Sequence, residues 1–558
     1  MKITRVPKLR SNSNILYLFI ASFLFTLPSV FAAHSKVFTR TVDLALVQSS
    51  LIRYPSDSVM KIYFETNNLP AQIITRALKL GIETKYLDTL LIWISMSLSV
   101  AALSLPIYAF TKFLKLSLSI SLIINNIPIS ATILGFPGLA LWFFPWAGSS
   151  TYPDFRYYTS HTLGFLGFLI LLIVIGLLLN NVLTVSGLLA GLNIAVHPFY
   201  GFISFLFWVM VFIGLAKDFK INKVVNKVIL LSVGCLLSGF SLFNSRKSQF
   251  GDSLPSQNMM DSYLRNWDSH RSDDLSLNWK AFLLFLIAFG VLRRIVSSHP
   301  PLESNLVFVA KSIQVLNVIA IIAYSYHVLG AQKLHQNIFM QAQIGRLQLA
   351  IGYLLTPLIV GAFVHSISRN NQITLPWFGR QIRSTKSIIT KELTLICVIL
   401  AIVTLLYNLN DISKKNTTEF NSSNKTFYCD INLLGKYPLV LTSQSTTIPM
   451  FRICKFPIVL DATSFDFIPY LPQTLVGVKK IIETGYGLDF DSPANNINCG
   501  CIPEVLHRNI WESRTEQEWL SIAQELNFSA IAAPAEWVIN VQGSVAVLPG
   551  VKLYVLRR

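Results

Sequence analysis

The stretch TLGFLGFLILLIVIGLLL, residues 162–179, contains no charged residue. A helix needs about 20 apolar residues to cross the hydrocarbon core of a bilayer, so this stretch is close to the length of a membrane span. Similar apolar segments lie near residues 15–33, 88–110, 116–136, 182–196, 199–215, 228–244, 280–296, 305–328, 346–366 and 392–409. The pattern predicts an α-helical polytopic membrane protein with about 11 transmembrane helices.

The composition agrees with a membrane protein. Hydrophobic residues make up 52% of the chain and charged residues only 13%, whereas a soluble domain carries about 25% charge. After residue 409 no long apolar segment follows. We therefore expect a transmembrane domain over residues 1–409, a linker over 410–428, and a small extracytoplasmic α/β domain over 429–558.

The distribution of basic residues predicts the orientation. Short cytoplasmic loops are rich in Lys and Arg, and such residues cluster at the N-terminus and in the loop 217–227. This topology places the N-terminus in the cytoplasm of an integral protein of the plasma or inner membrane. Loops 34–87, 137–161 and 245–278 and the C-terminal domain then lie outside. The run ending at Ala32 also fits signal-peptide cleavage, which would leave the rest unchanged.

The net charge of +18 is spread over separate loops. That distribution predicts contact with anionic lipid headgroups and no nucleic-acid partner. Four cysteines, Cys429, Cys454, Cys499 and Cys501, lie in the tail. On an oxidising side of the membrane they predict at least one disulfide, with the pairing left open.

The tail pattern predicts a mixed α/β domain. Short buried strands are expected at 437–442, 456–461 and 529–533, and a hairpin at 545–548 and 552–556. Thr515 and Glu518 form a capping-box pattern that opens a helix through Asn527. No glycine-rich phosphate-binding pattern opens a helix, so the sequence supports no nucleotide site.

Asp43 is the candidate catalytic residue, because it lies in the long loop 34–87 that follows the first apolar segment. Apolar spacing in this loop predicts amphipathic helices at the membrane interface. Two interpretations of Asp43 are open: it caps the helix that follows, or it acts as a general base.

The other candidates are polar residues near the outer ends of the apolar segments, and we expect them to bind substrate. Each also fits a structural interpretation, as a solvated loop residue, an interfacial residue or a capped turn. Trp267, beside three of them, could stack on a hydroxylated ring. The set is Asp154, His197, Asp268, His270, Arg271 and Arg346.

The layout resembles the GT-C glycosyltransferases. The resemblance rests on Asp43 within Thr41-Val-Asp-Leu-Ala, on the segment 187–198, on Gly345-Arg-Leu-Gln, and on the closing pattern from Ile522. It implies transfer of a sugar from a polyprenyl-phosphate-type donor at the outer face, with the lipid bilayer and a lipid-linked sugar as partners.

In that family context Asp43 would deprotonate the acceptor, while Arg346, with His270 and Arg271, would hold the lipid phosphate. No cofactor is expected. The resemblance admits a divalent metal at Asp43 and Asp154, but the residues alone predict no metal site. Two alternatives stay open: a transporter or flippase for a lipid-linked substrate, and a non-catalytic membrane protein with a binding tail.

Overall fold

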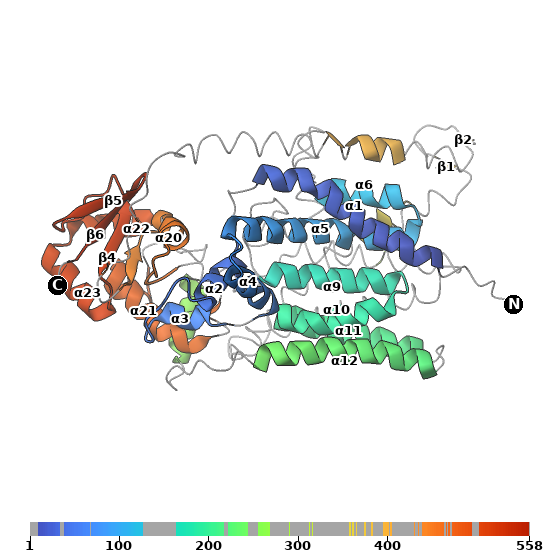
Figure 1. The fold of residues 1–558 in the computed structure, drawn as a ribbon, viewed down its shortest axis with the longest axis horizontal. Helices are drawn as coiled ribbons and strands as arrows, with labels where there is room; N and C mark the ends of the chain where they lie inside the picture. The colour runs from blue at the N-terminus through green and yellow to red at the C-terminus, as the bar shows by residue number, and fades with distance from the viewer. Residues whose placement is uncertain are drawn as a thin grey trace.

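The computed structural model consists of an apolar helix bundle joined to a compact α/β unit (Figure 1). The structure describes residues 9–33, 38–66, 68–125, 163–216, 221–243, 255–267, 394–400, 438–461, 471–493 and 502–556, together with scattered residues between them. The expected architecture, mainly helical with a small C-terminal sheet, is confirmed.

Among the described residues, seven apolar helices form the bundle, and Figure 1 shows them side by side. Their buried faces share one core of Leu, Ile, Val and Phe side chains. The helices are α1 (Leu9–Ala33), α5 (Thr84–Thr111), α6 (Leu114–Asn125), α9 (Leu163–Leu179), α10 (Leu183–Val196), α11 (Pro198–Ala216) and α12 (Ile221–Phe243). Each coincides with an expected apolar segment to within a few residues, or covers the described part of one.

The number of membrane spans is where expectation and structure differ. Among the described residues, α5 is the one helix both long and apolar enough to cross a bilayer, and six shorter apolar helices accompany it. The eleven spans are therefore not confirmed. Most residues of the expected segments 280–296, 305–328, 346–366 and 392–409 lie outside the described part of the chain. By length and composition alone, the single helix α5 is weak evidence for a membrane location.

Helix α10 ends at Val196, because Pro198 disfavours helical backbone at the residue before it, His197. His197 is accordingly extended, with φ −150° and ψ 111°, and α11 begins at the proline. Glycines let α10 and α12 approach closely. A Cβ on Gly191 would meet the backbone nitrogen of Cys235 at 2.7 Å, and one on Gly234 would meet the carbonyl oxygen of Leu188 at 2.5 Å.

A second core lies at one end of the bundle and is built from distant parts of the chain. It combines the loop after α1, the helix α13 (Gln257–Asn266) and the C-terminal region. The loop contributes α2 (Arg40–Gln48), α3 (Val59–Phe64) and α4 (Leu69–Lys79), which Figure 1 shows between the bundle and the sheet. We call this composite unit the outer domain, after its place at the end of the bundle.

Four strands form the sheet of the outer domain in the order β3-β4-β6-β5. The strands are β3 (Val440–Thr442), β4 (Ala530–Pro534), β5 (Ser544–Leu548) and β6 (Val551–Val555). β3 and β4 are parallel and the other pairs antiparallel, with Leu441 opposite Ile531 and Ile531 opposite Tyr554. A separate two-residue pair joins β1 (Ile373–Thr374) to β2 (Gln381–Ile382).

Short helices cover this sheet. They are α20 (Gln444–Ile448), η2 (Pro449–Ile453), η4 (Pro472–Thr474), α21 (Leu475–Lys480), η5 (Ile481–Tyr486), α22 (Glu504–Ser513) and α23 (Glu516–Leu526). The capping box at Thr515 and Glu518 is present as expected, and Asn527 ends α23 in the left-handed conformation. The strand expected at 456–461 is reduced to one parallel bridge, between Val440 and Ile458, because Pro457 has no N–H for a ladder.

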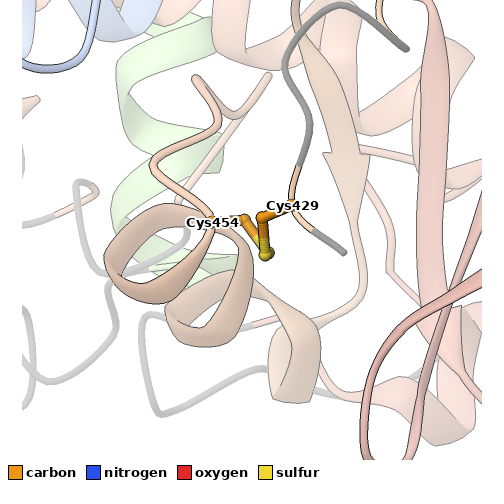
Figure 2. The surroundings of a disulfide bond; sticks show 2 residues. All are labelled: Cys429 and Cys454. Carbon is orange, nitrogen blue, oxygen red and sulfur yellow. A yellow bond between two sulfur atoms is a disulfide. The ribbon is translucent and has the colours of Figure 1, made fainter. Parts of the chain in front are cut away.

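A disulfide joins Cys429 to Cys454 (Figure 2). It confirms the expectation of at least one disulfide in the tail and ties the end of the linker region to η2. Cys499 and Cys501 lie outside the described residues. The bond closes a loop with a sequence separation of 25, which corresponds to roughly 3 kcal/mol of chain-entropy stabilisation.

Candidate functional site

A cluster of buried charged side chains lies where the outer domain meets the bundle. Arg40 and Asp43 come from α2, Asp88 from the second turn of α5, and Arg452 and Asp461 from the C-terminal region. We call these five residues the charge cluster. A buried charge is costly unless it is paired, so the geometry of the pairs decides what the cluster can do.

Arg452 contacts both α2 and α5. Its Nε forms an ion pair with Oδ1 of Asp43. Its Nη1 lies 3.1 Å from Oδ2 of Asp88, and its Nη2 donates to the carbonyl oxygen of Thr39 at 2.5 Å. The guanidinium also stacks near Phe38, with Cζ 5.4 Å from the ring centroid. One side chain from η2 thus fixes the start of α2 and the N-terminal end of α5.

Arg40 supplies the second guanidinium. Its Nη1 lies 3.3 Å from Oδ2 of Asp43 and forms an ion pair with Oδ2 of Asp461. Asp461 follows the segment that bridges to β3, so Arg40 links loop and tail independently of Arg452. Asp43 therefore lies between two guanidiniums, with one carboxylate oxygen toward each.

Asp88 connects α5 to the start of α2 by accepting hydrogen bonds from Thr39. Its Oδ1 accepts from the backbone nitrogen of Thr39 at 2.7 Å and from the Thr39 hydroxyl at 2.6 Å. Thr39 is the residue before α2. Through these bonds the entry into α2 is held against the bundle, which fixes the position of Asp43 four residues later.

The charges of the cluster do not balance when all five groups are ionised. Three carboxylates face two guanidiniums, which leaves one negative charge in a buried place. Burial raises the pKa of Asp43 and exceeds the opposing effects of Arg452 and Arg40, while Asp461 nearby raises it further. Asp43 is 6% exposed, and the partner of its Oδ1 is the Nε of Arg452. The carboxylate is therefore a better proton acceptor than an ordinary surface Asp.

The interpretation of Asp43 as a helix cap is not supported by the geometry. Thr39 occupies the cap position of α2, and Asp43 lies within the helix as a buried member of its first turn. The partners of Asp43 are the two guanidiniums.

The other expected site residues are placed as follows. His197 is half-buried at the end of α10, where its Nδ1 accepts from the backbone nitrogen of Tyr200 at 3.4 Å. This is a turn contact within the bundle and does not bring His197 into the charge cluster. The remaining predicted binding residues lie outside the described part of the chain: Asp154, Asp268, His270, Arg271 and Arg346.

The expectation that Trp267 could stack on a ligand is wrong. Its side chain is fully buried, stacks on Phe490 with centroids 5.7 Å apart, and donates to the carbonyl oxygen of Phe490 at 2.8 Å. Nearby, Tyr263 donates to the carbonyl oxygen of Phe465 at 2.6 Å. Trp267 and Tyr263 are buried in the core of the outer domain and anchor α13 there.

Sequence reasoning did not identify Arg40, Asp88, Arg452 or Asp461. Asp88 carried a usable signal, because an ionisable residue just inside a long apolar segment is expensive and needs a partner. Asp461 is the last residue of the expected buried strand 456–461. Arg452 carried no signal, since only the folded chain brings it to residues more than 350 positions away.

Neither candidate for a metal site gains support from the geometry. Two guanidiniums already occupy the oxygens of Asp43, and they would repel a divalent cation. An exposed acidic group of Glu483, Asp489 and Asp491 could hold an ion by distance. However, Lys479 already lies 2.6 Å from Asp491 and 3.6 Å from Glu483.

No protein-family model matches the chain. No curated protein matches it either. The chemistry of the charge cluster is therefore the basis for a functional proposal.

Proposed function

We propose that the chain is an integral membrane glycosyltransferase, using a polyprenyl-phosphate-type sugar donor at the outer face, with Asp43 as general base. The observation that carries the proposal is the position of Asp43. It lies on the helix after the first apolar segment, buried at the end of the bundle, with a raised pKa.

The proposed step is a proton transfer coupled to displacement. Asp43 takes the proton of an acceptor hydroxyl as the hydroxyl oxygen attacks the anomeric carbon. The bond from that carbon to the phosphate oxygen breaks, and polyprenyl phosphate leaves. A base with a raised pKa is closer to the operating pH and more effective. Arg40 and Arg452 are positioning residues that hold the carboxylate, while Arg346 stays the predicted partner of the lipid phosphate.

One observation favours a second candidate function. Asp43 is ion-paired on both oxygens and nearly buried, which is also what a purely structural joint would show. In that case the chain is a non-catalytic membrane protein whose outer domain binds a partner. The transporter alternative has no comparable observation in its favour.

The variant Asp43→Asn separates the two candidate functions. It keeps the shape of the side chain but removes its basicity. The assay incubates the purified full-length chain, in liposomes with membrane acceptors, with a panel of radiolabelled polyprenyl-phosphate hexoses and measures released polyprenyl phosphate. A general base contributes ~100- to 10,000-fold in rate, so transfer should fall by that range.

Asp57→Asn is the matched control. Asp57 is an exposed carboxylate of the same loop, 3.2 Å from the Nδ2 atom of Asn527, and this variant should transfer sugar at the wild-type rate. Thermal unfolding of both variants shows whether the fold persists. Wild-type activity in a folded Asp43→Asn variant would refute the role of Asp43 as general base. If the wild-type chain transfers sugar from none of the donors, the non-catalytic binding protein becomes the better-supported function.

A further inference from the structure

We propose that the turn at residues 79–86, between α4 and α5, is a membrane-surface site that inserts into the headgroup layer and binds anionic phospholipid. This inference does not depend on glycosyl transfer. It concerns a surface of the outer domain that the charge cluster does not use. We call residues 79–86 the headgroup turn.

Three large apolar side chains of the headgroup turn are exposed. Leu80 is 82% exposed, Tyr86 51% and Ile82 43%. Gly81 between them has φ +86°, and a Cβ there would meet no atom within 4 Å. A tight turn that projects apolar side chains into open space is costly in water, and a cluster of them marks an interaction site.

The surface is continuous with the longest apolar helix. Helix α5 begins at Thr84, within the headgroup turn, and in its second turn Leu90 is 42% exposed. On the other side Ile73 of α4 is 56% exposed. Exposed apolar side chains therefore lie on both sides of the headgroup turn, on α4 and on the first two turns of α5. The end of a spanning helix lies at the membrane interface.

Helix α4 is fixed across the end of the bundle, so the turn cannot withdraw from this position. Its opposite face buries Ala71, Ile74 and Leu78 in the outer domain. Gln72 donates to the carbonyl oxygen of Ser241, near the end of α12, at 3.2 Å. Figure 1 shows α4 at the junction between the bundle and the outer domain. An amphipathic helix anchored in this way lies in the plane of an interface.

The charges around the turn identify the occupant as an anionic lipid surface. Arg76, Lys79 and Lys85 are all exposed. Glu83 lies 2.8 Å from Lys85 and offsets one of the three positive charges. A patch with exposed apolar side chains and a net positive rim suits acyl chains below and phosphates above. A second copy of this chain, itself basic, would repel this rim.

The first test measures the depth of the turn. A spin label is attached at Leu80→Cys in full-length chain with Cys235, Cys397, Cys499 and Cys501 replaced by Ser. In liposomes containing phosphatidylglycerol the label should be more accessible to oxygen than to a water-soluble nickel chelate. The matched control is Val505→Cys on α22, an apolar residue that is 79% exposed and should be accessible to the chelate. A label at Leu80 as accessible to the chelate as that at Val505 overturns the proposal, and a label shielded from both reagents indicates a protein partner and overturns it too.

The second test uses the wild-type chain and needs no substitution. Phosphatidylglycerol liposomes should protect Lys79 from an amine-reactive reagent more than phosphatidylcholine liposomes do, and added salt should remove the difference. Lys480, an exposed lysine of the outer domain paired with Glu525, should react equally in both. Each basic residue near an anionic surface contributes a factor of about 5 in affinity, so Lys79→Gln should weaken the lipid-dependent insertion by that factor. Equal labelling of Lys79 in both lipids refutes the anionic preference.

Discussion

Replacing Arg452 by Met should destabilise the outer domain far more than the loss of an ordinary ion pair. The side chain of Arg452 is 3% exposed, and those of its partners Asp43 and Asp88 are 9% and 4% exposed. Met fills much of the same volume but leaves two buried carboxylates with one guanidinium fewer. Removing one partner of a buried pair costs about 3–5 kcal/mol.

The assay is urea unfolding of the full-length chain in detergent, followed by intrinsic fluorescence, since Trp511 and Trp519 are fully buried in the outer domain. Arg508→Gln is the control. Its ion pair with Glu512, at 3.2 Å, has side chains 44% and 26% exposed, and such pairs are worth about 0.5 kcal/mol or less. Adding Asp88→Asn to Arg452→Met should restore part of the loss. If Arg452→Met unfolds at the same urea concentration as Arg508→Gln, the cluster does not hold the domain.

Three further predictions concern the outer domain. Burial lowers the pKa of His507 to about 4, whereas the pKa of a histidine in the unfolded chain is about 6.5. The unfolded state therefore binds the proton more tightly. The free energy of unfolding should be highest above pH 6.5 and should fall by about 3 kcal/mol as the pH drops to 4. Urea midpoints across that range should show the loss, and His507→Phe should flatten it; equal slopes would contradict a buried neutral imidazole. Replacing Cys429 by Ser should lower the free energy of unfolding by about 3 kcal/mol, measured against wild type without reductant, and an unchanged midpoint would mean that the bond does not form. Thr515→Ala should cost about 1 kcal/mol through the lost cap of α23, and a loss below the error of the urea midpoint would count against the capping box.

Local patterns predicted much of the fold because they depend on near neighbours. The apolar runs that became α9, α10 and α11 and the capping box at Thr515 needed no knowledge of the tertiary structure. The hairpin of β5 and β6 was equally readable from its Pro549-Gly550 turn. Strand 456–461 was overestimated, because one proline removed a donor from a ladder that only the folded sheet defines.

The candidate site was predicted only in part, since its chemistry depends on long-range contacts. Position along the chain was enough to select Asp43, but its partner Arg452, and Asp461, which shares Arg40 with it, are more than 400 residues away. No periodicity connects such residues. Trp267 shows the opposite error: an aromatic residue in a polar loop looked like a ligand surface, whereas the fold uses it as a core anchor.

The shared core of the outer domain has a consequence for how the chain is made. Helices α2 to α4 leave the ribosome early, yet they bury their apolar faces against β3, β4 and their neighbours. Roughly 350 residues separate these helices from β3, which at about 5–20 residues per second is a delay of about 20 to 70 s. During that interval Asp43 and Asp88 have no Arg452 to pair with. During synthesis the apolar faces of α2 to α4 therefore stay unpaired until the last quarter of the polypeptide has been made. Truncation near the C-terminus would leave the first loop without the core against which it packs.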